Sequence, residues 1–90
     1  MIPYYPYKSD KKDNKYFIIT DSGKKVYFGA SGYEDFTQHK DVLRKKAYIA
    51  RHRKNEKWND KNTAGFWSRW LLWNKPTIEE SYNFIKEKFL

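Results

Sequence analysis

The residues of this sequence most capable of chemistry are basic side chains gathered in one stretch. Residues 37–58 contain eight lysines and arginines against two acids, and the whole 90-residue chain carries a formal net charge of +8. Positive charge concentrated in this way attracts polyanions, either nucleic acid or an acidic protein surface. The alternative is a solvated helix whose long side chains pack along their stems. The candidate contacts to phosphates or carboxylates are Lys40, Arg44, Lys45, Lys46, Arg51, Arg53 and Lys54.

Aromatic side chains form a second candidate binding group. The stretch AGFWSRWLLWNKP at residues 64–76 contains three of the four tryptophans. We expect most of it in the core, with one or two indole edges left exposed, because tryptophan is rarely fully buried. Tyrosine, tryptophan and arginine are also enriched at interface hot spots. The candidate partner-binding residues are Tyr4, Tyr5, Tyr7, Trp58, Arg69 and Trp70.

Catalytic and metal-binding patterns are missing from the sequence. There is no cysteine, and His39 and His52 stand on roughly opposite sides of one predicted helix. Neither a zinc-protease motif nor a phosphate-binding loop motif is present. The segment GASG at residues 29–32 could cradle an anion, but such glycine pairs usually mark turns. We therefore expect no enzyme activity, no cofactor, no metal ion and no small-molecule substrate.

A β-hairpin and three helices are predicted to position these groups. The runs KYFIIT and KVYFGA flank a DSGK turn, which is typical of a hairpin. An exposed hairpin edge invites pairing with a strand of another chain. We expect a helix from Thr37 to about Lys54, a short one from Thr63 to about Trp73, and a last one capped by Thr77 with Glu80.

The apolar faces of these helices should form the core. In the last helix, a single stripe joins Ile78, Tyr82, Ile85 and Phe89. In the basic helix, one strip contains Leu43, Ala47 and Ala50, and a nearby strip contains Val42 and Ile49. These strips should face the domain, which leaves Asp41, Lys45, Tyr48 and His52 on the back of the helix.

The chain organisation follows from these elements. Residues 1–14 begin with the tyrosine- and proline-rich MIPYYPY and read as an extended arm and linker, whereas residues 15–90 should form one compact α+β domain. No apolar run is long enough for a membrane span, and the first residues lack the order of a signal peptide. The lack of cysteine fits a reducing compartment.

The sequence also resembles a family of small basic proteins encoded by large DNA viruses of algae and amoebae. The likeness covers about residues 15–89 and is carried by GYEDFTQHKD, YIARH and TAGFWSRWLLWNKPTIEES. This family has no settled activity, so the resemblance implies a viral context but transfers no catalytic residues. Some small basic proteins of such viruses are particle components, so we expect the protein in the virion and, during assembly, in the host cytoplasm or nucleus.

Three functions remain open at this point. The leading one is a structural component of the particle, a minor capsid or capsid-associated protein that contacts neighbouring virion proteins. The second is a sequence-independent DNA- or RNA-binding protein that compacts or escorts the viral genome, in which Tyr48 and Trp58 could stack on bases. The third is an accessory protein that binds a host factor.

Overall fold

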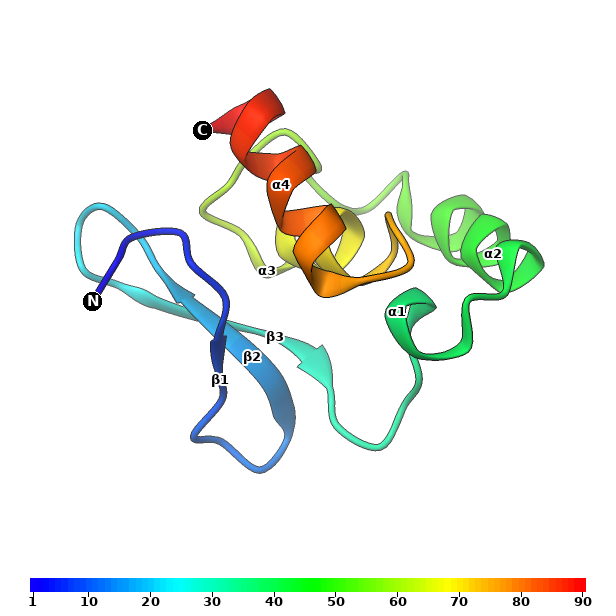
Figure 1. The fold of residues 1–90 in the computed structure, drawn as a ribbon, viewed down its shortest axis with the longest axis horizontal. Coiled ribbons are helices and arrows are strands. Elements are labelled where there is room, and N and C mark those ends of the chain that lie inside the picture. Colours follow the sequence, from blue (N-terminus) through cyan, green and yellow to red (C-terminus); the bar gives the residue numbers. More distant parts are fainter.

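The computed structural model describes residues 1–90 as an α+β fold, in which helices lie on one side of a small antiparallel sheet (Figure 1). The sheet has the order β1-β2-β3. The strands are β1 (Tyr7–Lys8), β2 (Asn14–Ile19) and β3 (Lys25–Ala30). The helices are α1 (Phe36–His39), α2 (Val42–His52), α3 (Ala64–Trp67), the π-helical η1 (Ser68–Leu72) and α4 (Ile78–Phe89).

The predicted hairpin is present and consists of β2 and β3. Its turn includes Gly23 at a φ of +88°, a conformation that glycine adopts without the steric cost other residues meet. Phe17 of β2 lies opposite Tyr27 of β3. The third strand comes from this chain itself, because β1 pairs with β2 and places Tyr7 opposite Phe17.

The N-terminal segment differs from the predicted extended arm. Tyr4 is buried at 6 % exposure and belongs to the core, although the sequence suggested a tyrosine free to contact a partner. Its backbone N–H donates to the Ile19 carbonyl at 2.8 Å, and its hydroxyl donates to Asn62 Oδ1 at 2.7 Å. An aromatic ring at the end of the sheet gains more by burial than by solvation, so this segment folds against the domain.

The single helix predicted from Thr37 is broken into two. Lys40 adopts a left-handed φ of +56° and ends α1, and the Asp41 side chain then caps α2 by accepting from Leu43 and Arg44 N–H groups. The cap of α1 is Asp35 instead of Thr37. An aspartate at each start satisfies backbone donors that a continuous helix would have paired internally.

The core lies between the sheet and the later helices. Its centre is built from Phe66 and Trp67 of α3, Leu71 and Leu72 of η1, Ile85 of α4, and Ile18 and Phe28 of the sheet. The predicted stripe of α4 is confirmed, since Ile78, Tyr82 and Phe89 pack around this centre beside Ile85. Most of the tryptophan-rich stretch is therefore core, as its apolar content predicts.

Candidate functional site

Helix α2 packs on the domain through the face that the sequence assigned to its back. The Tyr48 ring is 6 % exposed and stacks on Trp73, with ring centroids 4.5 Å apart and planes 3° from parallel. On the other side, it stacks on His52 at 4.3 Å. The Lys45 ammonium donates to the Asn74 carbonyl at 2.8 Å. These contacts turn the rest of the helix outwards.

The predicted inward strips of α2 are therefore wrong for every residue except Ile49, which is half-buried. Val42 is 54 % exposed and Leu43 is 76 % exposed, and Ala47 and Ala50 are exposed as well. The physical reason is the partner: Trp73 offers the Tyr48 ring a parallel stack at 4.5 Å and the Asn74 carbonyl accepts from Lys45, contacts that a leucine and two alanines cannot make. Helical periodicity located the two faces but could not decide which one the domain would take.

The seven predicted basic contacts do not all share one surface. Lys45 points inward, with its ammonium also 4.8 Å from the Phe36 ring centroid, and burial together with the positive charges of Arg69 and Lys75 lowers its pKa. The other six are solvent-exposed: Lys40, Arg44, Lys46, Arg51, Arg53 and Lys54. Of these six, Arg44 pairs with Glu34 at 3.4 Å, and Lys40 donates to the Thr37 carbonyl at 3.0 Å.

The predicted partner-binding residues Trp58, Arg69 and Trp70 are engaged with one another. The Arg69 guanidinium lies 4.3 Å from the Trp70 ring centroid and 5.4 Å from that of Trp58. The Trp70 indole N–H donates to the Trp58 carbonyl at 2.6 Å. Burial lowers the pKa of Arg69, whose Nη1 donates to the Trp73 carbonyl at 2.7 Å. Each of the three is partly buried, and the Trp58 indole N–H donates to Glu56 Oε1 at 2.9 Å.

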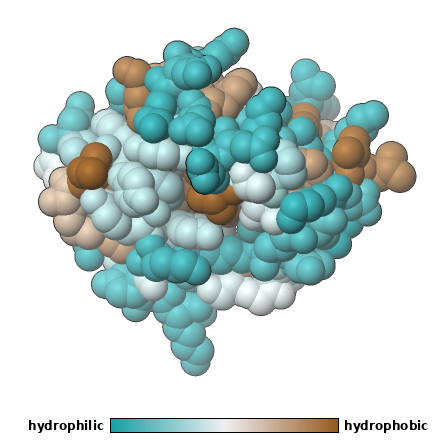
Figure 2. Space-filling model, in the orientation of Figure 1, coloured by the Kyte–Doolittle hydropathy of each residue, from teal (hydrophilic) through white to brown (hydrophobic).

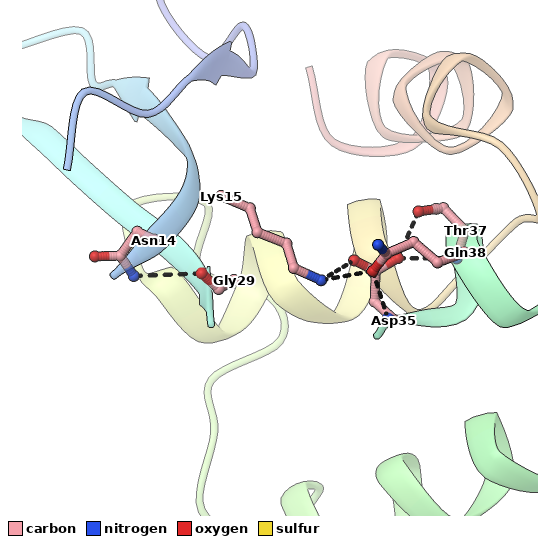
Figure 3. Close-up of polar contacts among 6 residues, drawn as sticks. All are labelled: Asn14, Lys15, Gly29, Asp35, Thr37 and Gln38. Carbon is pink, nitrogen blue, oxygen red and sulfur yellow. Dashed lines mark hydrogen bonds and ion pairs between the residues drawn. The ribbon is translucent and has the colours of Figure 1, made fainter. Parts of the chain in front are cut away.

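A partly buried polar network holds the loop that faces α2 (Figure 3). The Lys15 ammonium donates to Asp35 Oδ2 at 2.8 Å and to Gln38 Oε1 at 2.7 Å. Asp35 also accepts from the backbone N–H of Thr37 at 2.9 Å, which completes the cap of α1. Because Lys15 belongs to β2, this network ties the loop and α1 to the sheet.

A cleft of about 460 Å³ lies between this loop, the end of β3 and α2. The Glu34–Arg44 ion pair borders it, and Tyr33 adds a ring that is 75 % exposed. Ala47 and Trp73 supply apolar lining. The cleft mixes apolar walls with charges of both signs, so it suits a protein segment better than a polyphosphate.

The outward surface of α2 combines apolar and basic side chains, and we refer to Val42, Leu43, Lys46, Ala47, Ala50 and Arg51 as the α2 surface. Figure 2 shows brown hydrophobic atoms projecting among teal hydrophilic ones on the side of the molecule occupied by α2. An exposed leucine costs little alone, but apolar groups ringed by charges are a usual feature of protein interfaces. Its apolar residues, Val42, Leu43, Ala47 and Ala50, belong to the two strips that the sequence analysis expects to face the domain.

The two histidines near the site make contacts within the fold. His39 Nδ1 accepts from the Asp41 backbone N–H at 2.9 Å, and His52 Nδ1 lies 3.3 Å from Glu56 Oε2. No group of three or more histidine, aspartate or glutamate side chains is placed to hold a metal ion. None of the helices combines the length and the apolar character needed to cross a bilayer.

Comparison with known proteins places the chain without assigning it an activity. No curated protein and no solved structure matches the sequence. A model of a family of unknown function, DUF5754, matches residues 7–52, which is just over half of the 90 residues. The matched segment runs from the first residue of β1 to the last residue of α2, so it contains the whole sheet and the α2 surface. The chain therefore belongs to this family of unknown function.

Proposed function

We propose that the protein is a non-enzymatic structural component of a large DNA virus particle and that its α2 surface binds an acidic neighbouring protein. The observation that carries the proposal is the exposure of Leu43, at 76 %, beside the exposed bases of the same helix. The viral setting of the proposal rests on the family resemblance of the sequence, and the proposed binding to an acidic protein rests on the exposed side chains of α2.

Charge complementarity identifies the kind of partner. The chain has a net charge of +8, so a second copy would be repelled, whereas an acidic surface would be attracted. Lys46 and Arg51 are exposed on the same helix as Leu43 and Ala47. A partner that presents carboxylates around an apolar side chain would satisfy both kinds of group. The cleft beside α2 offers such a side chain a place between Ala47 and Trp73.

Binding of a nucleic-acid duplex is the second candidate, favoured by the exposure of Lys46, Arg51, Arg53 and Lys54. Phosphate contacts require cations but gain nothing from an exposed leucine. If duplex binding were the main function of α2, replacing Leu43 would have no effect and the salt dependence would be steep. The two candidates therefore differ in what Leu43 contributes.

Site-specific photocrosslinking in purified particles tests the leading proposal. A photoreactive phenylalanine analogue at Leu43 should form one dominant adduct with an acidic virion protein, and the same analogue at exposed Asn83 of α4 should not. Arg51→Glu should abolish the adduct. Absence of the protein from particles, or crosslinks from Leu43 only to DNA, would contradict the proposal, and the DNA result would support the second candidate.

A further inference from the structure

One aromatic residue from each strand lies in a line across the sheet. Tyr7 of β1 is opposite Phe17 of β2, which is opposite Tyr27 of β3. Side chains alternate between the faces of a strand, and the neighbouring Ile18 and Phe28 point into the core. The three rings therefore occupy the other face, which no helix covers in Figure 1. Phe17 is only 5 % exposed, because its two neighbouring rings and the Lys25 side chain lie against it, whereas Tyr7 and Tyr27 are half-buried.

The line continues past the edge strand to α4. Ring centroids are 5.4 Å apart between Tyr27 and Phe17, and 5.7 Å apart between Phe17 and Tyr7. Tyr7 then contacts Tyr5 at 4.9 Å, and Tyr5 contacts Tyr82 at 5.4 Å. We refer to these five residues as the aromatic row.

Lysine ammonium groups lie over three rings of the row. Lys11 is 4.2 Å from the centroid of Tyr27, and Lys25 is 4.8 Å from the centroid of Phe17. Lys86 is 5.0 Å from the centroid of Tyr82. All three lysines are exposed, so their ammonium groups are open to an anion while their stems shield the rings.

A single acid organises one end of the row. The Tyr27 hydroxyl donates to Asp10 Oδ1 at 2.7 Å, and Asp10 Oδ2 lies 3.7 Å from the Lys25 ammonium. This bond lowers the pKa of Asp10 and raises that of Tyr27. The hydroxyl is thereby anchored at the rim, and the Tyr27 ring is held in a fixed position beside Phe17.

We propose that the aromatic row is a binding site for single-stranded nucleic acid. A single strand carries both groups that the row can recognise: phosphates for the lysines and unpaired planar bases for the rings. When Lys11 moves from Tyr27, or Lys86 from Tyr82, to a phosphate, the face of that half-buried ring becomes free to stack on a base. Duplex bases are stacked on one another and cannot use the rings, and the carboxylates of an acidic peptide would engage the lysines but leave the rings unused.

This inference concerns a surface other than α2 and stands independently of the proposed function. The row depends on stacking, so sequence preference should be weak. With three phosphates neutralised, the logarithm of the affinity should fall with a slope of about −2 against the logarithm of salt concentration. That slope corresponds to a loss of about twentyfold between 50 and 200 mM salt.

Fluorescence anisotropy with labelled 12-nucleotide oligothymidylate and a 12-base-pair duplex tests the inference. The single strand should bind more tightly than the duplex. Tyr27→Leu should weaken binding at least about fivefold, whereas Tyr27→Phe, which keeps the ring, should not. The pair Lys11→Gln and Lys25→Gln alters exposed side chains only, so the fold should remain, and the salt slope should become shallower.

Three outcomes would overturn the inference. One is the absence of oligothymidylate binding at 50 mM salt. Another is a loss of oligothymidylate binding in the variants Arg51→Gln and Arg53→Gln together with unchanged binding in the variants of the aromatic row. That result would place the contact on α2. The last is competition by polyglutamate as strong as that by unlabelled oligothymidylate, which would make the row a surface for acidic proteins.

Discussion

Replacing Tyr48 by alanine should destabilise the protein far more than replacing Leu43 by alanine. Tyr48 is 6 % exposed, and a buried aromatic side chain removes roughly 150–250 Å² from water. At about 25 cal/mol per Å², that burial amounts to about 4–6 kcal/mol, which is an upper bound because the unfolded chain also buries part of the ring. We expect a loss of about 3 kcal/mol, at the lower end of the range for aromatic-to-alanine substitutions.

The matched substitution Leu43→Ala should change the free energy of unfolding by less than about 0.5 kcal/mol, because this side chain is 76 % exposed. Urea denaturation followed by tryptophan fluorescence measures both values. Thermal melts should show a fall of about 12–24 °C for Tyr48→Ala and little change for the control. If Leu43→Ala cost as much as Tyr48→Ala, the orientation of α2 and everything inferred from its outward surface would be refuted.

Three further substitutions or conditions test the fold. Gly29→Ala should lower the free energy of unfolding by about 2–3 kcal/mol in urea denaturation, because φ is +78° and the new Cβ would lie 2.9 Å from Leu72 of η1. The control Gly32→Ala, at a φ of +87° with no atom within 4 Å, should lower it by only about 1–2 kcal/mol. Equal losses would contradict the close contact at Gly29. Asp35→Ala should cost about 2–3 kcal/mol in the same measurement, since it removes the cap of α1 and leaves the Lys15 ammonium with Gln38 as its only side-chain acceptor. A loss below about 1 kcal/mol would count against the network. Burial raises the pKa of Tyr48, so as the pH rises this tyrosine ionises in the unfolded chain before it does so in the folded protein, and stability falls above about pH 10. Between pH 9 and pH 11, the melting temperature should therefore fall less for Tyr48→Phe than for the unaltered protein. An identical fall in both proteins would exclude Tyr48 as the cause.

The elements set by local sequence signals could be predicted. The glycine-containing turn between two β-rich runs identified the hairpin, and the Thr77 cap with the stripe of Ile78, Tyr82 and Ile85 identified α4. These signals act over a few residues, so they need no knowledge of the rest of the chain. The tryptophan-rich stretch was assigned to the core for a similar reason, because its apolar content exceeds what a surface would carry.

The orientation of α2 and the position of the first residues could not be predicted, because both depend on distant partners. Tyr48 faces inward since Trp73 offers it a parallel ring, and Tyr4 is buried since Ile19 and Asn62 accept its hydrogen bonds. None of these three partners is near in sequence to the tyrosine that it contacts. The aromatic row could not be predicted for the same reason, because its rings line up only once β1 has paired with β2.

The aromatic contacts of α2 in solution test the central claim most directly, since the α2 surface exists only if Tyr48 packs inward. Nuclear Overhauser spectra of the isotope-labelled protein would measure them. We predict cross-peaks between the Tyr48 ring and the Trp73 indole, whose centroids are 4.5 Å apart, and none from the Leu43 methyl groups to any core ring. Cross-peaks from the Leu43 methyl groups to Phe36 or Trp73, without contacts from Tyr48, would contradict the account.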